Sequence, residues 1–270
     1  MTINIHATVS DFSFPYFEYM KENYISTSKK HSIKFYCYCL DSSSFHKASG
    51  INNLTPVQMK PSAGTTGHCN AVGVALRNLK NTEPGSIDII ADVDTVMLID
   101  GWDIITENIL NEVGVFGSSF ERIGGRCSGS IDIQMYKNKP SFTWFAASKK
   151  HDFSRMETYP CKEKHLVIST QELSDLYQLP IGYKLLRDTG WQIPSYLRDN
   201  GITYKILVQE KPTDNAKVLK TGENYHEEFQ LDGVPFMAHQ RGSMSKAYRK
   251  HELSVKFYNT LDLYFKNGIK

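Results

Sequence analysis

Residues 87–103 read IDIIADVDTVMLIDGWD and place two acidic residues directly behind a short apolar run. The run 87–91 predicts a buried β-strand that stops at Asp92. Asp92 and Asp94 are two residues apart, so on an extended chain their carboxylates point the same way. Two like charges beside a buried strand cost free energy unless a cation compensates them, and Mg²⁺ or Mn²⁺ binds carboxylates together with substrate phosphates. The segment therefore predicts a divalent-metal site at the end of a buried strand.

Strand and helix patterns alternate in front of this segment. Strand patterns cover residues 3–9, 33–40 and 57–60, helix patterns cover 15–24 and 68–79, and residues 41–44 (DSSS) are typical of a turn. This alternation predicts an α/β fold with a mostly parallel central sheet flanked by helices. Open sheets of this kind bind ligands at the carboxyl ends of their strands, where Asp92 lies.

The chain beyond residue 103 is less regular. Strand patterns cover residues 114–119, 131–136, 142–147, 203–208 and 234–239, helix patterns cover 169–177, 191–199 and 245–266, and residues 212–228 look like a loop. No internal repeat and no linker interrupts the chain. We therefore expect one continuous domain over residues 1–270, whose N-terminal part binds one ligand and whose C-terminal part binds another.

Composition excludes several classes of protein. Among 270 residues, 40% are hydrophobic and 22% are charged, as is ordinary for a soluble globular protein. The net charge of +2 provides no basic surface for nucleic acid. The five cysteines include no C-x-x-C pair, and reduced thiols fit a cytoplasmic setting. The sequence shows no secretory signal and no apolar stretch of the roughly 18 residues that a spanning helix needs, so we expect a cytoplasmic protein without a membrane span.

At the level of motifs, residues 87–103 resemble the D-x-D segment of GT-A glycosyltransferases, including the large family 2. Residues 67–71 (GHCNA) resemble the G-H-x-x-A-L helix start of the same group. The resemblance covers roughly residues 3–245. It implies a single GT-A (Rossmann-like) domain in which about residues 1–100 bind a nucleotide sugar, about 101–245 bind the acceptor, and about 245–270 form a C-terminal helix.

The resemblance also implies a ligand set. In GT-A enzymes the D-x-D acids carry Mn²⁺ or Mg²⁺, which bridges the diphosphate of the donor. Asp92 and Asp94 would hold this ion, and His239 would be its third ligand, since a neutral imidazole can complete a site with two carboxylates. Residues implied to contact the nucleotide or its diphosphate are Thr8, Ser10, Asp41, His68, Asp92, Arg241 and Ser243.

Residues 186–191 (LRDTGW) contain Asp188, an acid whose surroundings resemble a catalytic motif. Inverting GT-A enzymes carry a carboxylate at a helix start that faces the acceptor, and Asp188 matches it. The resemblance therefore implies that Asp188 is the base that takes the proton from the acceptor hydroxyl. The alternative is that Asp188 caps the following helix.

The expected function is metal-dependent, hexosyltransferase-type transfer of a sugar from a nucleotide-diphosphate donor, expected to be a UDP-sugar. The acceptor is a hydroxyl of a carbohydrate or another molecule, and the transfer inverts the anomeric centre. Three alternatives stay open: a retaining GT-A enzyme, a sugar-1-phosphate nucleotidyltransferase and a non-catalytic carbohydrate-binding protein. Nucleotidyltransferases open with a loop rich in glycine and arginine after the first strand, whereas residues 10–14 here read SDFSF.

Other polar motifs receive structural interpretations. Asp100 and Asp103 are expected to be turn and helix-cap residues. The glycine-rich segment 124–130 is expected to be a flexible loop on the acceptor side. Residues 226–228 (HEE) lack the H-E-x-x-H spacing of a metal site.

Overall fold

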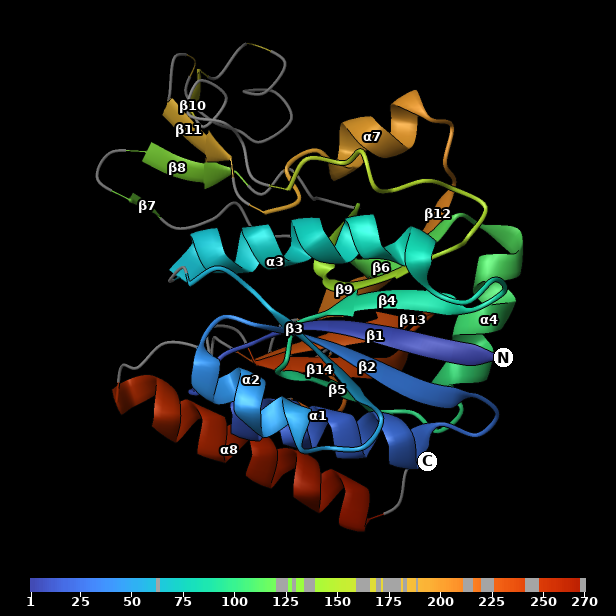
Figure 1. Cartoon of the computed structure of the whole chain (residues 1–270), viewed down its shortest axis with the longest axis vertical. Helices are drawn as coiled ribbons and strands as arrows, with labels where there is room; N and C mark the ends of the chain where they lie inside the picture. The colour runs from blue at the N-terminus through green and yellow to red at the C-terminus, as the bar shows by residue number, and fades with distance from the viewer. Residues whose placement is uncertain are drawn as a thin grey trace.

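The structure, a computed structural model, describes most of the chain. The described residues are 1–61, 64–119, 126–127, 130–133, 139–158, 166–168, 171, 181, 184–187, 189–210, 216–219, 226–240 and 248–267. They form a ten-stranded sheet in the order β3-β2-β1-β4-β9-β6-β12-β13-β14-β5 and a four-stranded sheet in the order β10-β11-β8-β7. Figure 1 shows the large sheet between layers of helices, which confirms the predicted α/β class.

Strands and helices alternate in the N-terminal third, as predicted. The elements are β1 (Thr2–Val9), α1 (Phe14–Thr27), β2 (Ser32–Cys39), α2 (Ser42–Ser49), β3 (Leu54–Gln58), α3 (Gly64–Asn78), η1 (Leu79–Asn81) and β4 (Ile87–Ala91). Strands β3, β2, β1 and β4 are neighbours and run parallel. Their carboxyl ends consequently meet at one edge of the sheet, where the segment after Ala91 begins.

The prediction of a mostly parallel sheet holds only for this part. The following elements are β5 (Thr95–Met97), α4 (Trp102–Glu112), β6 (Val115–Ser119), β9 (Pro140–Ala147), β12 (Tyr204–Glu210), β13 (His226–Leu231) and β14 (Val234–Gln240). Within the large sheet β12 is parallel to β6, but the other pairings that follow β4 in the strand order are antiparallel. The turn at Asp232 and Gly233 is too short for a crossover, so β13 and β14 must be antiparallel. The loop predicted over 212–228 is wrong in its last three residues, where β13 begins.

The remaining described elements lie outside the large sheet. They are β7 (Arg126–Cys127), β8 (Ser130–Ile133), β10 (Leu166–Ile168), β11 (Lys184–Arg187), α7 (Ile193–Asp199) and α8 (Tyr248–Lys266). In Figure 1, α3 covers one face of the large sheet, and the small sheet and α7 lie on that side. Helices α1, α2 and α8 cover the other face. The expected loop over 124–130 and helix over 169–177 fall largely outside the described residues.

Apolar side chains fill both faces of the large sheet. Alternate residues of β1 (Ile3, Ile5, Ala7 and Val9) pack with Phe17 and Met20 of α1. The opposite face packs against α3 through Val72, Ala75 and Leu76, in contact with Ile90 and Phe145. A third cluster joins Phe257 and Leu261 of α8 to Val96, Leu98 and Ala238. Burial of this area is the main stabilising contribution to the fold, and it fixes the directions in which the polar residues of the same strands point.

Two acidic residues hold the ends of helices and loops in ways that the sequence patterns did not predict. Asp41 is the N-cap of α2, and its Oδ1 accepts a hydrogen bond from Ser44 N at 2.8 Å, so the predicted turn over 41–44 is the first turn of a helix. The expected cap of α4 is wrong for Asp103, because Gly101 is the N-cap. Asp103 lies in the first turn and accepts backbone N–H bonds from Lys29, Lys30 and His31 instead. Asp103 therefore fixes the loop between α1 and β2.

We expect Asp103→Ala to lower the free energy of unfolding by roughly 2–4 kcal/mol, because it leaves one buried and two part-buried backbone N–H groups without their acceptor. Although burial opposes it, these hydrogen bonds lower the pKa of Asp103. A folded-state pKa below the unfolded one gives stability that is present above the unfolded pKa and lost as pH falls through the folded pKa. The difference between wild type and variant should thus shrink in acid. Urea titrations at several pH values test this, with Asp100→Ala, an exposed partner of Lys29, as the control expected to change little.

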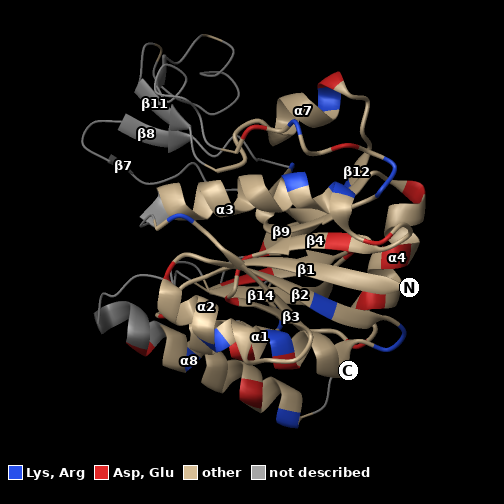
Figure 2. Ribbon diagram, in the orientation of Figure 1, with Lys and Arg blue, Asp and Glu red and all other residues tan. Residues whose placement is uncertain are grey.

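Charged residues of both signs are spread over the described part of the protein. Lys, Arg, Asp and Glu are interspersed along the ribbon drawn in Figure 2, in keeping with the net charge of +2. Across the described part of the chain, no helix has both the length and the apolar character needed to cross a bilayer.

Candidate functional site

Asp92 and Asp94 lie on a tight turn between β4 and β5. Asp92 N donates to Thr143 O of the neighbouring strand at 2.9 Å. The carbonyl of Asp92 accepts from both Thr95 N at 3.3 Å and Thr95 Oγ1 at 2.7 Å. The Thr95 hydroxyl is also 2.9 Å from the hydroxyl of Tyr24, a buried residue of α1. These contacts fix the backbone of the turn, and with it the positions from which the two carboxylate side chains project.

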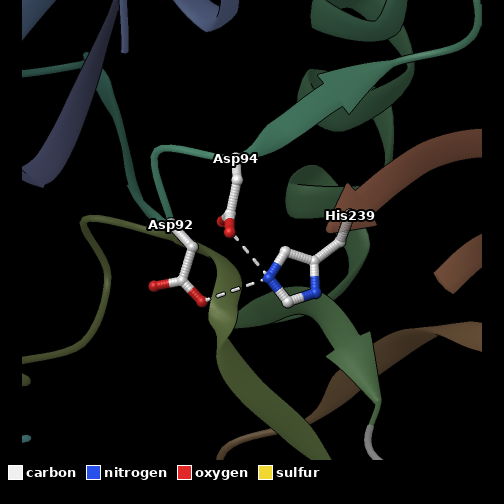
Figure 3. Close-up of side chains that lie close together, drawn as sticks. All are labelled: Asp92, Asp94 and His239. Carbon is white, nitrogen blue, oxygen red and sulfur yellow. Dashed lines mark ion pairs between the residues drawn. The ribbon is translucent and has the colours of Figure 1, made fainter. Parts of the chain in front are cut away.

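His239 reaches this turn from the far end of the sequence. Strand β14 pairs with β5, which places His239 opposite Thr95, and Gln240 N donates to Asp94 O at 3.2 Å. His239 Nε2 lies 3.3 Å from Asp94 Oδ1 and 3.8 Å from Asp92 Oδ2. Figure 3 shows the imidazole pointing toward both carboxylates. One ligand atom from each of the three residues lies within 4.8 Å of the others.

A further residue, the buried Glu227 of β13, contacts the imidazole on the side away from the two acids. Its Oε2 lies 2.8 Å from His239 Nδ1. A carboxylate only accepts hydrogen bonds, so Nδ1 carries the hydrogen and Nε2 faces the acids. The sequence interpretation set Glu227 aside because its neighbours lack a metal-binding spacing. The Asp232–Gly233 hairpin turn predicts that β13 and β14 pair, but it does not fix which residue of β14 lies opposite Glu227.

The site is rich in negative charge. Burial raises the pKa of Asp92, His68 and His239 oppose this increase, and the charge of Asp94 adds to it. Burial of the His239 ring disfavours its charged form, but the carboxylates of Asp94 and Glu227 outweigh burial and raise its pKa well above the usual range. Three carboxylates, those of Asp92, Asp94 and Glu227, thus surround one imidazole. Two carboxylates and an imidazole are a donor set that fits Mn²⁺ or Mg²⁺ with open positions for substrate oxygens, so these residues could hold such an ion.

Residues predicted to contact the nucleotide gather at the same edge of the sheet. His68 of α3 places its Nε2 3.7 Å from Asp92 Oδ1. Thr8 is a buried residue near the carboxyl end of β1, one position beyond the pair formed by Ala7 and Ala91. His68 thus contacts Asp92, and Thr8 lies on the strand next to the one that Asp92 follows.

Ser10 and Asp41 lie where β1 and β2 end. Ser10 hydrogen-bonds through N and Oγ to Ser13 Oγ. Asp41 uses Oδ1 to cap α2 and Oδ2 to accept from Asp11 N at 2.9 Å, so its carboxylate braces the loop that follows β1. Asp188, Arg241 and Ser243 lie outside the described residues, and their roles stay predictions.

No protein-family model matches the chain, and no curated protein sequence matches it. Solved structures to which it is similar include a mannosyltransferase from Pyrobaculum calidifontis in complex with GDP-mannose and Mn²⁺, with 18% identity, 44% of this chain and 35% of that chain covered, and a TM-score of 0.33. The galactosyltransferase LgtC, with donor and acceptor sugar analogues, matches at 12% identity over 76% of this chain and 73% of its own, with a TM-score of 0.40.

A candidate glucose-1-phosphate thymidylyltransferase from Bacillus anthracis matches at 12% identity over 77% of this chain and 87% of its own, with a TM-score of 0.38. The chain spans only about a third of the mannosyltransferase. Glycosyltransferases that use nucleotide sugars are thus among the solved structures similar to this chain, as the GT-A resemblance predicts. Because these TM-scores lie below 0.5, the function is inferred from the residues of this chain.

Proposed function

We propose that this protein is a metal-dependent glycosyltransferase that moves a sugar from a nucleotide-diphosphate donor to a hydroxyl acceptor. The observation that carries the proposal is the convergence of Asp92, Asp94 and His239 at the carboxyl edge of parallel strands. Two acids and an imidazole that approach within 4.8 Å form a ready cation site. The edge on which they lie is where open α/β folds bind nucleotides.

Each group of residues has a distinct role in this proposal. Asp92, Asp94 and His239 hold the ion, and Thr8, Ser10, Asp41 and His68 contact the nucleotide. Arg241 and Ser243, which follow directly after β14, donate hydrogen bonds to the diphosphate. A bound divalent ion would act as a Lewis acid that stabilises the charge developing on the leaving diphosphate.

The acceptor side of the proposal rests on Asp188. As the base, Asp188 takes the proton of the acceptor hydroxyl while the diphosphate leaves from the opposite face of the sugar. The next residue, Thr189, hydrogen-bonds through Oγ1 to Sγ of Cys69, the residue after His68. This contact places Thr189 beside α3. The anomeric configuration of the product, read by NMR, distinguishes an inverting enzyme from a retaining one.

We expect UDP with Mn²⁺ to raise the melting temperature, whereas UDP after exhaustive chelation does not. A ligand at about 100 times its Kd that binds only the folded state stabilises it by about 2.7 kcal/mol. Melting temperatures measured with UDP, GDP and their sugars, each with Mn²⁺, Mg²⁺ or chelator, test this expectation. The nucleotide that gives the largest increase identifies the nucleobase of the donor. No shift with any nucleotide and metal would contradict the proposal.

The same preparation separates the alternative functions. Release of pyrophosphate from a nucleoside triphosphate and a sugar 1-phosphate would identify a nucleotidyltransferase. Glycan binding that needs neither metal nor nucleotide would identify a carbohydrate-binding protein. Release of a nucleoside diphosphate that depends on an acceptor sugar is the result expected here.

A further inference from the structure

Glu227 is a buried carboxylate whose partner in the described structure is a proposed metal ligand. Its side chain is 4% exposed, and its Oε2 lies 2.8 Å from Nδ1 of His239, which is also buried. The two residues are directly opposite each other on the antiparallel strands β13 and β14, so their side chains project from the same face of the sheet. The imidazole is held between this carboxylate and the two acids of the β4–β5 turn.

We propose that Glu227 is a positioning residue that makes His239 a metal ligand through Nε2 and so gives the site a preference for a transition-metal ion such as Mn²⁺ over Mg²⁺. The inference rests on the proposed function, because it takes Asp92, Asp94 and His239 as the ligands. Accepting the Nδ1 hydrogen fixes the ring orientation, and it would leave Nε2 as the nitrogen available to a cation that displaces any proton held there.

The preference follows from the chemistry of the donor set. Mg²⁺ favours oxygen ligands in near-ideal octahedral geometry. An imidazole nitrogen suits first-row transition metals better, and a hydrogen-bonded carboxylate increases the basicity of that nitrogen. Asp92 and Asp94 can bind either ion. Discrimination between the two ions therefore depends on His239, and through it on Glu227.

The neighbouring Glu228 provides a matched control. It is also buried, but successive residues of a strand point to opposite faces. Its carboxylate accepts backbone N–H bonds from Lys217, Val218 and Leu219, so it anchors that segment rather than the imidazole. Glu227→Gln and Glu228→Gln thus remove the same charge from adjacent buried positions, and only the first changes the contact with His239.

The experiment measures metal affinity on the intact protein without any assay of sugar transfer. Free Mn²⁺ is counted by electron paramagnetic resonance during titration of metal-free protein, and Mg²⁺ is measured by competition. Glu227→Gln should raise the Kd for Mn²⁺ by about 10- to 100-fold and the Kd for Mg²⁺ by clearly less. Glu228→Gln should leave both Kd values as in wild type, whatever its effect on the melting temperature.

A double-mutant cycle tests the route of the effect. In a His239→Asn background, Glu227→Gln should cause no further loss of Mn²⁺ affinity. An unchanged Mn²⁺ Kd in Glu227→Gln, an equal loss for both ions, or the same loss in the His239→Asn background would overturn the inference. If Glu227→Gln does not fold, Glu227→Asp withdraws the carboxylate by one methylene, and an unaltered Mn²⁺-to-Mg²⁺ ratio in that variant overturns it equally.

Failure here is distinguishable from failure of the proposed function. Wild-type protein that binds Mn²⁺ and loses it in Asp94→Asn but not in Glu227→Gln would retain the metal site and remove the role of Glu227. Wild-type protein that binds no divalent ion would remove both.

Discussion

We expect Asp94→Asn to abolish the proposed sugar transfer, with a rate reduced by at least about 10³-fold, while the protein remains folded. The Asp94 side chain is 6% exposed, and its Oδ1 is the carboxylate oxygen nearest to His239 Nε2. Asparagine keeps the shape of the side chain but provides no anionic ligand for a hard cation. An interaction that stabilises the transition state more than the ground state is lost, and each 1.4 kcal/mol of this loss corresponds to about tenfold in rate.

Stability should move in the opposite direction to activity. Burial raises the pKa of Asp92, and the neighbouring charge of Asp94 adds to the increase, so without metal the two carboxylates repel each other. Neutralising Asp94 relieves this repulsion, so the metal-free melting temperature should be unchanged or higher than in wild type. Wild type should gain melting temperature with Mn²⁺, and the variant should not.

Asp100→Asn is the matched control for this experiment. Asp100 is exposed, it pairs with Lys29 at 2.8 Å, and it lies a few residues beyond the turn. Its loss should leave transfer, Mn²⁺ binding and melting temperature close to wild type. Transfer that survives in Asp94→Asn, or in wild type after exhaustive chelation, would count directly against a metal-dependent mechanism.

Asp88→Ala is expected to cost about 3–5 kcal/mol of folding free energy, the typical effect of removing one partner from a buried ion pair. Asp88 is 1% exposed in β4, and it contacts His6 Nε2 at 3.0 Å and Lys149 Nζ at 2.5 Å. Asn4 Nδ2 and Thr82 Oγ1 donate to it at 3.1 and 2.9 Å. Alanine removes the acceptor that these four donors share and leaves the partly buried charge of Lys149 without its carboxylate partner.

The pH dependence of stability identifies this cause. Burial opposes ionisation of Asp88, but hydrogen bonds and charge from His6 and Lys149 outweigh burial and lower its pKa. The stability due to Asp88 is therefore present above the unfolded pKa, about 3.9, and disappears as pH falls through the lower folded value. Asp88→Ala should flatten the acid limb of the stability profile measured by urea unfolding.

Glu83→Ala is the control for Asp88→Ala. Glu83 pairs with Lys34 at 2.6 Å, a separation similar to that between Asp88 and Lys149. The side chains of both Glu83 and Lys34 are exposed, however. Its loss should change stability by no more than about 1 kcal/mol. Equal costs for the two variants would show that burial of Asp88 adds nothing.

The fold class and the proposed ligands could be predicted because they depend on short-range patterns. The apolar run before Asp92 and the alternation of strands and helices around it are local, and they predicted the parallel part of the sheet. His239 was found through the order of motifs, although it lies far from Asp94 in the sequence. What brings them together is the pairing of β14 with β5, and a three-residue strand such as Thr95–Met97 is too short for a distinctive pattern.

The roles of Glu227 and Asp103 could not be predicted, because each depends on tertiary contacts. Asp103 looks like a helix cap by sequence, yet its carboxylate is used by a loop more than 70 residues earlier. Glu227 depends on cross-strand register. Counting back from the Asp232–Gly233 turn, where Leu231 pairs with Val234, would place Glu227 opposite Ala238. Hydrophobic patterning carries no information about one extra residue on one side of a hairpin.

That extra residue is a β-bulge: the register shifts between Phe229 and Gln230, so that Gln230 pairs with Pro235 but Phe229 pairs with Met237. Whether the number of β14 residues between the turn and His239 is odd or even consequently decides which side chains face Asp92 and Asp94. Deleting one residue at the bulge would exchange the two faces of the strand, turning Ala238 toward the acids and His239 toward the apolar cluster under α8. Insertions or deletions near this hairpin therefore keep His239 on the same face only when they change the strand by an even number of residues. A substitution there affects only the side chain that it replaces.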